Sequence, residues 1–210
     1  MIEYPVKVLV DAGVKDIVLV TGGNKPGSFL ELFKDGKSFG INKLYYTYQE
    51  GNGGIADALY LAEPFMRKGE DCVVVLGDNY FELGIKSQMA KWKARDKKTV
   101  GSMCLVRETE DPWSFGIAQI EEGKVISIEE KPDNPKSNLA ILGCYFFDEK
   151  VWSYLYNNIN FSSRGEKEIT SVLEKYMDVD ALSCSDYDAF WSDMGTFENL
   201  MVVSNRVSKG

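Results

Sequence analysis

The chain contains no histidine, and this absence removes several kinds of catalytic site. A Ser-His-Asp or Cys-His nucleophile needs an imidazole as its base, and many zinc sites use imidazole ligands. Any chemistry must therefore depend on carboxylates, lysines, a bound metal ion or the positioning of substrates. The sequence also lacks a C-x-x-C pair, which predicts buried, reduced thiols for its four widely spaced cysteines: Cys72, Cys104, Cys144 and Cys184.

An excess of basic residues and long apolar runs are also missing. The chain has 24 Lys and Arg against 32 Asp and Glu, which gives a formal net charge of −8. Nucleic acid and anionic membrane surfaces both require a basic footprint, so neither is expected as a partner. No run approaches the length of a membrane span and no signal peptide is recognisable, which predicts a cytoplasmic protein.

Apolar residues recur in short segments with helix or strand spacing. The pattern predicts helices at 2–12, 28–33, 55–66 and 85–95, with strands at 16–21, 43–48 and 73–76. Strands then predominate, at 100–106, 115–120, 125–129 and 140–147, before helices at 150–156, 166–177 and 197–207.

This order of elements predicts an α/β fold with a mixed sheet flanked by helices. Short strand-helix-strand periods favour parallel pairing through right-handed crossovers in the first half. The strand-rich stretch after residue 100 is expected to extend the sheet in a mixed or antiparallel way. No repeat, linker or low-complexity segment divides the 210 residues, so a single domain is predicted.

Two aspartates that end strand-like runs are the strongest candidates for chemistry. Asp78 follows an apolar run in the motif Leu-Gly-Asp-Asn (76–79), and Asp193 lies in Trp-Ser-Asp-Met-Gly-Thr (191–196). An open α/β sheet binds ligands beyond the carboxyl ends of its strands, where Asp78 is expected. A single aspartate more often caps a turn or a helix. The pairing of the two therefore carries the prediction of a metal site that handles phosphates.

Two glycine-rich segments follow predicted strands. The first, at 21–27, matches neither the dinucleotide pattern nor the P-loop, so an ordinary turn is the better interpretation and a dinucleotide-dependent oxidoreductase is the weakest hypothesis. The second, at 49–58, places Gly54 at a helix N-terminus, where a ligand can approach backbone amides, and Gln49 can pair with a base edge. Flexible turn chemistry explains this second segment equally well.

Two cationic side chains lie at the ends of predicted elements. Lys131 follows a strand and precedes Pro132, which is expected to hold the lysine extended and within reach of a phosphate. A solvated charge is the more common state of such a lysine. Arg164 comes just before a helix whose first-turn glutamates suit the helix dipole, although helix initiation does not require the arginine.

In their order along the chain, these motifs resemble those of the sugar-1-phosphate nucleotidyltransferases, and the thymidylyltransferases among them most closely. The resemblance covers nearly the whole chain. Its motifs are Gln49 with Gly54, Leu-Gly-Asp-Asn at 76–79, Phe-Gly at 115–116, Glu-Lys-Pro at 130–132, Gly-Cys-Tyr-Phe at 143–146, Arg-Gly-Glu at 164–166 and Trp-Ser-Asp-Met-Gly-Thr at 191–196.

The resemblance implies a nucleotide-binding, Rossmann-like sheet with a sugar-binding β extension. It also implies a reaction that joins dTTP to glucose 1-phosphate and yields dTDP-glucose and pyrophosphate. A uridylyltransferase for the same sugar phosphate is the related alternative, and a homo-oligomer is expected because related enzymes often self-associate.

The same resemblance implies a role for each candidate residue. Asp78 and Asp193 would hold Mg²⁺ against the phosphates, a use of one or two carboxylates that suits this metal. Asp78, Lys131 and Asp193 are the implied catalytic residues. The implied substrate-binding residues are Gln49 and Gly54 at the base, Arg164 at the sugar phosphate, and Asn79, Gly116, Glu130, Tyr145 and Trp191 around the substrates.

One part of the family pattern is missing. The family begins with a buried strand and a glycine-rich phosphate loop, whereas residues 1–5 align with the helix that follows them, so residues 1–210 are expected to be an N-terminally truncated nucleotidyltransferase domain. Strands beside the missing one would carry unpaired backbone groups. Loss of the loop's donors predicts weak activity of this chain alone. A non-catalytic protein that binds or senses sugar nucleotides is therefore the alternative function.

Overall fold

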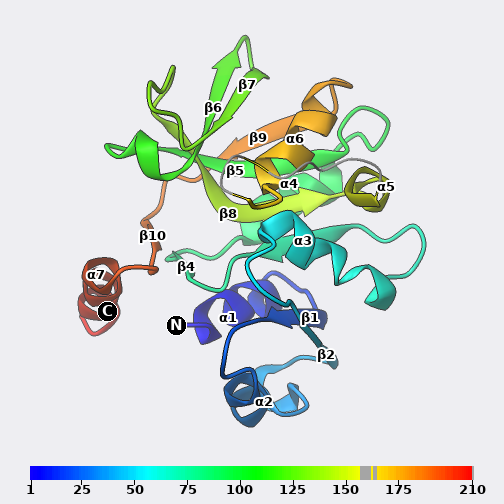
Figure 1. The fold of residues 1–210 in the computed structure, drawn as a ribbon, viewed down its shortest axis with the longest axis vertical. Helices are drawn as coiled ribbons and strands as arrows, with labels where there is room; N and C mark the ends of the chain where they lie inside the picture. Colours follow the sequence, from blue (N-terminus) through cyan, green and yellow to red (C-terminus); the bar gives the residue numbers. More distant parts are fainter. Residues whose placement is uncertain (157–161, 163–164, 210) are drawn as a thin grey trace.

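A computed structural model describes residues 1–156, 162 and 165–209 (Figure 1). Its helices are α1 (Glu3–Asp11), α2 (Gly27–Phe33), α3 (Ile55–Tyr60), α4 (Lys86–Ala94), α5 (Val151–Tyr156), α6 (Ile169–Met177) and α7 (Phe197–Val207). Its strands are β1 (Asp16–Thr21), β2 (Lys43–Tyr48), β3 (Cys72–Val75), β4 (Asn79–Phe81), β5 (Ser102–Glu108), β6 (Gly116–Glu121), β7 (Lys124–Glu130), β8 (Leu139–Phe147), β9 (Leu182–Asp186) and β10 (Trp191–Asp193).

The N-terminal layer consists of β1 and β2 with α1 packed against them. The two strands pair in parallel, with Asp16 opposite Lys43 and Thr21 opposite Tyr48. Gly13 turns the chain from α1 into β1 at a φ of +91°, a conformation that glycine adopts readily because it has no Cβ. The predicted parallel pairing of these two strands is confirmed.

The main sheet is mixed, with strand order β7-β6-β8-β5-β9 and β3 also paired to β8. β5 and β9 are parallel, and the other pairs are antiparallel. β6 and β3 share one edge of β8: β6 pairs with Leu139 and Ala140, and β3 pairs with residues 144–147. Gly143 lies between these two pairings, which leaves room on this edge for a side chain from another segment.

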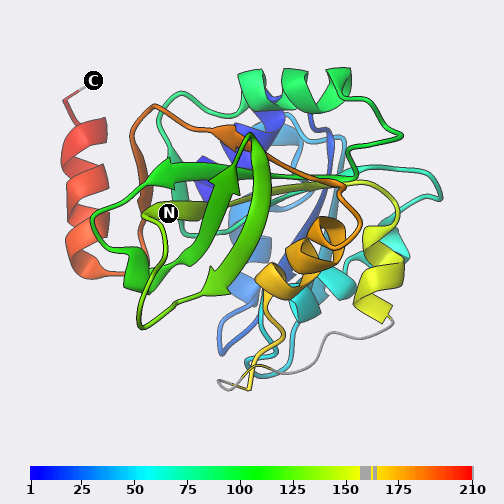
Figure 2. The same ribbon diagram turned by 90° about the horizontal axis from the view of Figure 1, so that it is seen from above.

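Successive residues of β5 and β8 face two separate hydrophobic cores, as the alternation of a strand requires. Met103 and Leu105 pack in the core that includes α1, β1 and α4. Cys104 and Val106 pack in the core that includes α3, α5 and α6. Figure 2 shows α4 on one side of the sheet and α3, α5 and α6 on the opposite side. The predicted α/β fold with a mixed sheet flanked by helices is confirmed.

β1 of the two-stranded sheet and β3 of the main sheet form no ladder of backbone hydrogen bonds with each other. In the described part of the chain β1 pairs only with β2, and β3 pairs only with β8. Both strands line a cavity of about 680 Å³, and the four apolar residues of β3 all stay partly exposed. The predicted parallel pairing is therefore wrong for β3, which instead joins the sheet antiparallel to β8.

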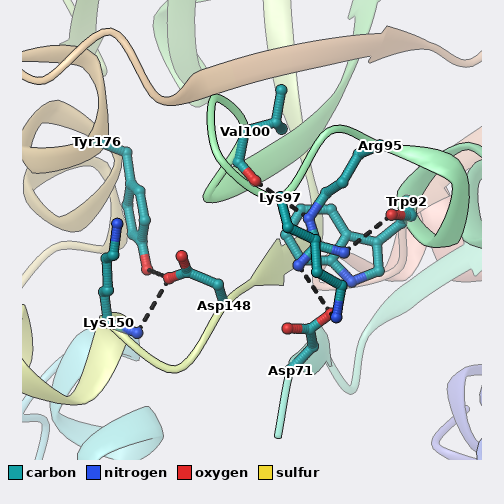
Figure 3. A network of polar contacts seen from close by, with 8 residues as sticks. All are labelled: Asp71, Trp92, Arg95, Lys97, Val100, Asp148, Lys150 and Tyr176. Atoms are coloured by element: carbon teal, nitrogen blue, oxygen red, sulfur yellow. Dashed lines mark hydrogen bonds and ion pairs between the residues drawn. The ribbon is translucent and has the colours of Figure 1, made fainter. Parts of the chain in front are cut away.

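A buried arginine fastens the end of α4 to the start of β3 (Figure 3). The Arg95 guanidinium donates to the Asp71 carboxylate at 2.8 Å and to the carbonyls of Trp92 and Val100 at 2.9 and 3.1 Å. It also stacks over the Trp92 ring, with its carbon 3.4 Å from the ring centre. Its side chain is only 5% exposed, so α4 and β3 are held by contacts that exclude water.

The remaining differences from the predicted elements are local. The helix predicted at 55–66 divides into α3 and a 3₁₀ turn at Glu63–Phe65, because Pro64 cannot continue an α-helix. β4 and β9 were not predicted, since neither has a long apolar run. No helix in the described residues is long and apolar enough to cross a membrane.

Candidate active site

The structure brings Asp78 and Asp193 together although 114 residues separate them in the sequence. Asp78 follows β3 and leads into β4, and Asp193 ends β10, which pairs antiparallel with β4. The Met194 N–H donates to the Asp78 carbonyl at 2.7 Å. A Cβ added at Gly195 would lie 2.9 Å from Asp193 Oδ1 and 3.8 Å from Asp78 Oδ2, so both carboxylates lie around one point.

The electrostatics of this pair fit a small divalent cation. Burial raises the pKa of the Asp193 carboxyl, and the charge of Asp78 adds to this effect. The Gly195 N–H, which donates to Asp193 Oδ1 at 2.7 Å, and the charge of Lys131 act in the opposite direction. Two neighbouring carboxylates with no histidine or cysteine suit Mg²⁺, which takes one or two carboxylates and substrate oxygens. No group of three or more metal-ligating side chains occurs among the described residues.

Asn79 connects Asp78 and Trp191 to β8 through hydrogen bonds of its side chain. Its side chain is 1% exposed and lies at the edge of β8 between the residues that pair with β6 and those that pair with β3. There its Oδ1 accepts from the Gly143 N–H at 3.1 Å. The same oxygen accepts from Trp191 Nε1 at 2.8 Å, while Nδ2 donates to Asp78 Oδ1 at 2.8 Å. These contacts orient Asp78 and Trp191, and the role of Asn79 in binding substrate stays a prediction.

Lys131 lies at the end of the β6–β7 hairpin, and its charge opposes the rise in the pKa of Asp193. Its N–H donates to the Phe115 carbonyl at 3.0 Å, and its φ is +43°. The prediction that Pro132 holds Lys131 extended is therefore wrong, because the closing hydrogen bond of the hairpin selects a left-handed backbone. A non-glycine residue in that region stores strain of about 1–3 kcal/mol, a feature found often at functional sites.

Three predicted sugar-pocket residues meet at the start of the β extension. Gly116 and Glu130 are register partners on β6 and β7, and an added Cβ at Gly116 would lie 3.3 Å from Glu130 Oε2. Burial raises the pKa of the Tyr145 phenol, and the charges of Glu130 and Asp78 contribute to this rise. Tyr145 therefore links this group to the carboxylate pair. Trp191 borders the group through Phe115, whose ring centre is 5.3 Å from its own.

Gln49 and Gly54 form a second group with two residues that the sequence did not single out, Asp57 and Lys167. Gln49 Nε2 donates to the Gly54 carbonyl at 2.9 Å and to Asp57 Oδ2 at 3.0 Å. Lys167 Nζ donates to Asp57 Oδ1 at 3.2 Å. A Cβ at Gly54 would lie 2.4 Å from the Lys167 carbonyl oxygen, so glycine is required here by close packing. Arg164 lies outside the described residues.

Arg107 was also missed, because a single arginine at a strand end carries no motif. It extends from β5 and donates to the carbonyls of Tyr187 (3.3 Å) and Ala189, in the segment that leads to β10. It therefore helps to place the strand that carries Asp193. Asp78 lies just beyond the carboxyl end of β3, which is where a sheet of this kind binds ligands, and Gln49 and Gly54 line the cavity that β1 and β3 border.

This fold and this carboxylate pair define a class of nucleotide-handling enzymes, and the family comparison agrees. A family model described as nucleotidyl transferase matches residues 1–210, and the chain belongs to that family. Its members with this sequence pattern are sugar-1-phosphate nucleotidyltransferases, which are enzymes.

Individual members of the family are similar to this chain over nearly its whole length. The chain is 36% identical over 203 residues to glucose-1-phosphate thymidylyltransferase of Neisseria gonorrhoeae, a match that covers 95% of this chain and 69% of the relative. It is 34% identical over 209 residues to the protein of the same name from Xanthomonas campestris pv. campestris, covering 98% and 69%.

Solved structures give the same result for the fold. A structure described as a glucose-1-phosphate thymidylyltransferase from Bacillus anthracis, in complex with sucrose, has a TM-score of 0.88 at 34% identity and covers 98% of this chain and 81% of its own. A UDP-glucose pyrophosphorylase bound to UDP-glucose has a TM-score of 0.81 at 21% identity, covering 99% and 86%, and is similar in fold alone.

Proposed function

We propose that this protein transfers a thymidylyl group from dTTP to glucose 1-phosphate, which yields dTDP-glucose and pyrophosphate. The observation that carries the proposal is the convergence of Asp78 and Asp193 beyond the carboxyl end of β3, with Lys131 beside them. Relatives named glucose-1-phosphate thymidylyltransferase at 34–36% identity support the choice of nucleotide and sugar. The substrates are metabolites of the cytoplasm, where we expect the protein to act.

In this proposal the chain positions the reactants and balances their charge. An oxygen of the sugar phosphate attacks the α-phosphorus of dTTP in line, a new P–O bond forms, and the bond to the pyrophosphate leaving group breaks. Mg²⁺, held by Asp78 and Asp193, would neutralise phosphate charge during this exchange. Lys131 and Arg164 would hold the phosphate of the sugar.

The other predicted residues would select the substrates. Gln49 can turn its amide toward the base if it exchanges its contact with the Gly54 carbonyl for one with the ligand. Gly116, Glu130 and Tyr145 would line the sugar pocket, and Trp191 would form its wall beside the metal. Asn79 would act by holding Asp78 in place.

The test is pyrophosphate release from glucose 1-phosphate with dTTP or UTP and Mg²⁺, together with Mn²⁺ binding followed by electron paramagnetic resonance. Asp193→Asn is expected to abolish both turnover and Mn²⁺ binding, whereas Asp188→Asn, at an exposed aspartate nearby, leaves both unchanged. Equal Mn²⁺ binding by the two variants would reject the metal site. A preference for UTP would favour the uridylyltransferase alternative.

We further propose that a strand from an N-terminal segment beyond these 210 residues occupies the space between β1 and β3. The facing edges of the two strands and the apolar cavity between them support this, because an unpaired backbone group is costly when buried. Hydrogen exchange with a lysine-flanked apolar hexapeptide added in trans tests it. Protection of β1 and β3 amides is expected, and a peptide with a central proline should give none. Amides already protected without peptide would contradict the proposal.

The same cavity favours a second candidate function, a protein that binds sugar nucleotides without catalysis. In this candidate the space between β1 and β3 stays open and offers no backbone donors to the leaving pyrophosphate, and loss of one such donor can lower the rate by about a hundredfold. Calorimetry with dTDP-glucose and UDP-glucose separates the two. Binding without any pyrophosphate release would support a sensor, and absence of binding would reject it.

Self-association is proposed through α7, several of whose apolar side chains are exposed. Phe197, Met201 and Val202 are 83%, 58% and 51% exposed, and a patch of this kind often marks a contact with another protein. Light scattering is expected to show a dimer that Met201→Lys dissociates. A monomer at all concentrations would contradict this.

A further inference from the structure

Cys104 and Cys184 lie in contact although 80 residues separate them. Cys104 is on β5 and Cys184 is on β9, and the parallel pairing of these strands places them directly opposite each other. Their sulfur atoms are 3.3 Å apart. Both are free thiols, and neither is used by the proposed reaction.

The backbone geometry at this position is compatible with a covalent link. Neighbouring strands lie about 4.8 Å apart, within the range of about 4.4–6.8 Å that Cα atoms span in disulfides. Register partners point to the same face of a sheet, so the two Cβ atoms also face one another. Bond formation therefore requires the sulfur atoms to approach without a rearrangement of either strand.

The two thiols differ in access, which suits a sequential oxidation. Cys104 is fully buried, and its contact with Cys184, followed by burial, raises its pKa well above the ordinary value. Cys184 is only partly buried, so an oxidant can reach it first. Oxidation follows access and thiolate character, and a neighbouring thiol captures the first product.

We propose that Cys104 and Cys184 form a reversible disulfide when the protein meets a hydroperoxide. The Cys184 thiol gives up its proton and its sulfur attacks the peroxide oxygen, the O–O bond breaks, and a sulfenic acid forms while the leaving oxygen takes up that proton and departs as water or an alcohol. The Cys104 sulfur then attacks the Cys184 sulfur, the S–O bond breaks, and the Cys104 proton leaves with the sulfenic hydroxyl as a molecule of water. The peroxide is reduced by two electrons, and the two thiols are oxidised to one disulfide.

The link would join β5 to β9, the strand that precedes β10 and Asp193. Cys104 is the register partner of Tyr145 on β8, so Tyr145, Cys104 and Cys184 form one row across three strands. β9 continues toward β10 and Asp193. A bond across this row would fix β9 against β5 and is expected to raise the melting temperature by about 5–10 °C.

The experiment is peptide mapping under non-reducing conditions after treatment with hydrogen peroxide. A cross-link between the peptides that contain Cys104 and Cys184 is expected, with loss of two hydrogens and full reversal by dithiothreitol. Cys184→Ser should abolish both the cross-link and the rise in melting temperature. Cys72→Ser, at another partly buried thiol, should change neither.

Three results would overturn the proposal: Cys184 oxidised to a sulfinic acid while Cys104 stays a free thiol, disulfides only between two copies of the chain, or a cross-link that involves Cys72 or Cys144. Since the mapping is done on the unaltered protein, it tests whether Cys104 and Cys184 form a disulfide even where a variant folds poorly.

Discussion

At the scale of single residues, Asn79 shows how a site can depend on a side chain that never needs to touch a substrate. Its amide lies at the edge of β8 and makes three hydrogen bonds, with the Asp78 carboxylate, the Trp191 indole and the Gly143 backbone N–H. Because the Asn79 side chain and its bond to the Gly143 N–H are buried, water would not replace that bond. The carboxylate pair therefore depends on Asn79 for its geometry.

Replacing Asn79 by alanine should lower the free energy of unfolding by about 3 kcal/mol, because the Gly143 and Trp191 N–H groups lose their buried acceptor. Urea unfolding measures this, and Trp191 fluorescence should shift to longer wavelength. Asn205→Ala, at an exposed position on α7, should change the free energy by less than about 0.5 kcal/mol. Equal effects of the two substitutions would show that Asn79 has no such role.

Gly54 and Gly51 provide a matched pair for testing close packing. Both have positive φ, at +89° and +71°, so alanine brings backbone strain at either position, and Gly54 with its ψ of 173° lies in a region that is essentially restricted to glycine. Only at Gly54 would the new Cβ meet the Lys167 backbone, at 2.4 Å. Thermal unfolding should therefore show a clearly larger loss for Gly54→Ala than for Gly51→Ala. The same loss for both would mean that segments 49–54 and 165–168 are not held together.

Sequence reasoning was accurate for residues whose chemistry follows their type and less so for residues that depend on neighbours. Asp78 and Asp193 do converge as predicted. Gln49 was expected to face a base, which stays a prediction, and no spacing pattern predicts the bonds of its amide to Gly54 and Asp57. Lys131 was expected to be extended, since the preference set by Pro132 is local and the Phe115 hydrogen bond outweighs it.

At the scale of elements, the attachment of α4 to β3 depends on one buried arginine (Figure 3). Arg95→Leu should lower the free energy of unfolding by about 3 kcal/mol, because Asp71 loses its 2.8 Å ion pair and is left with the 3.7 Å pair to the exposed Lys97, and two carbonyls lose their donor. Arg67→Leu removes an exposed pair with Glu70 and should cost less than about 1 kcal/mol. Chemical denaturation compares the two, and a difference below 1 kcal/mol would contradict this account.

The longer elements were predictable because their hydrophobic periodicity is strong, whereas three short strands were not equally visible. β9 has the sequence Leu-Ser-Cys-Ser-Asp, which carries little apolar signal and becomes a strand because β5 offers it an edge. β4 and β10 have three residues each and, among the residues that the structure describes, pair only with one another. Their existence depends on a contact between distant segments, which propensity alone does not encode.

At the scale of the whole molecule, several buried groups make the fold sensitive to alkaline pH. Burial raises the pKa of Cys72 from 9.0 to about 12 and that of Tyr187 from 10.0 to about 12. The unfolded chain therefore loses these protons first as the pH rises from about 9 to 12, and unfolding releases protons in that window. The stabilisation is complete below pH 9 and is lost toward pH 12.

Urea unfolding at pH 7.5, 9.5, 10.5 and 11.5 should show a free energy that falls by up to about 1.4 kcal/mol per pH unit for each such group. Cys72→Ala should reduce the slope that begins near pH 9, and Tyr187→Phe should reduce only the slope that begins near pH 10. A free energy that stays constant up to pH 11 would count against burial of these groups in the folded state.

The sequence by itself determined the kind of chemistry and the order of the elements. The absence of histidine, the excess of acidic residues and the two aspartate motifs depend on residue type, and the hydrophobic periodicity depends on local geometry. Tertiary structure alone decided that Asn79 orients Asp78, that Cys104 meets Cys184, and that β1 and β3 leave a cavity between them. Each of these depends on which strands become neighbours, and that choice is made by the packing of the whole chain.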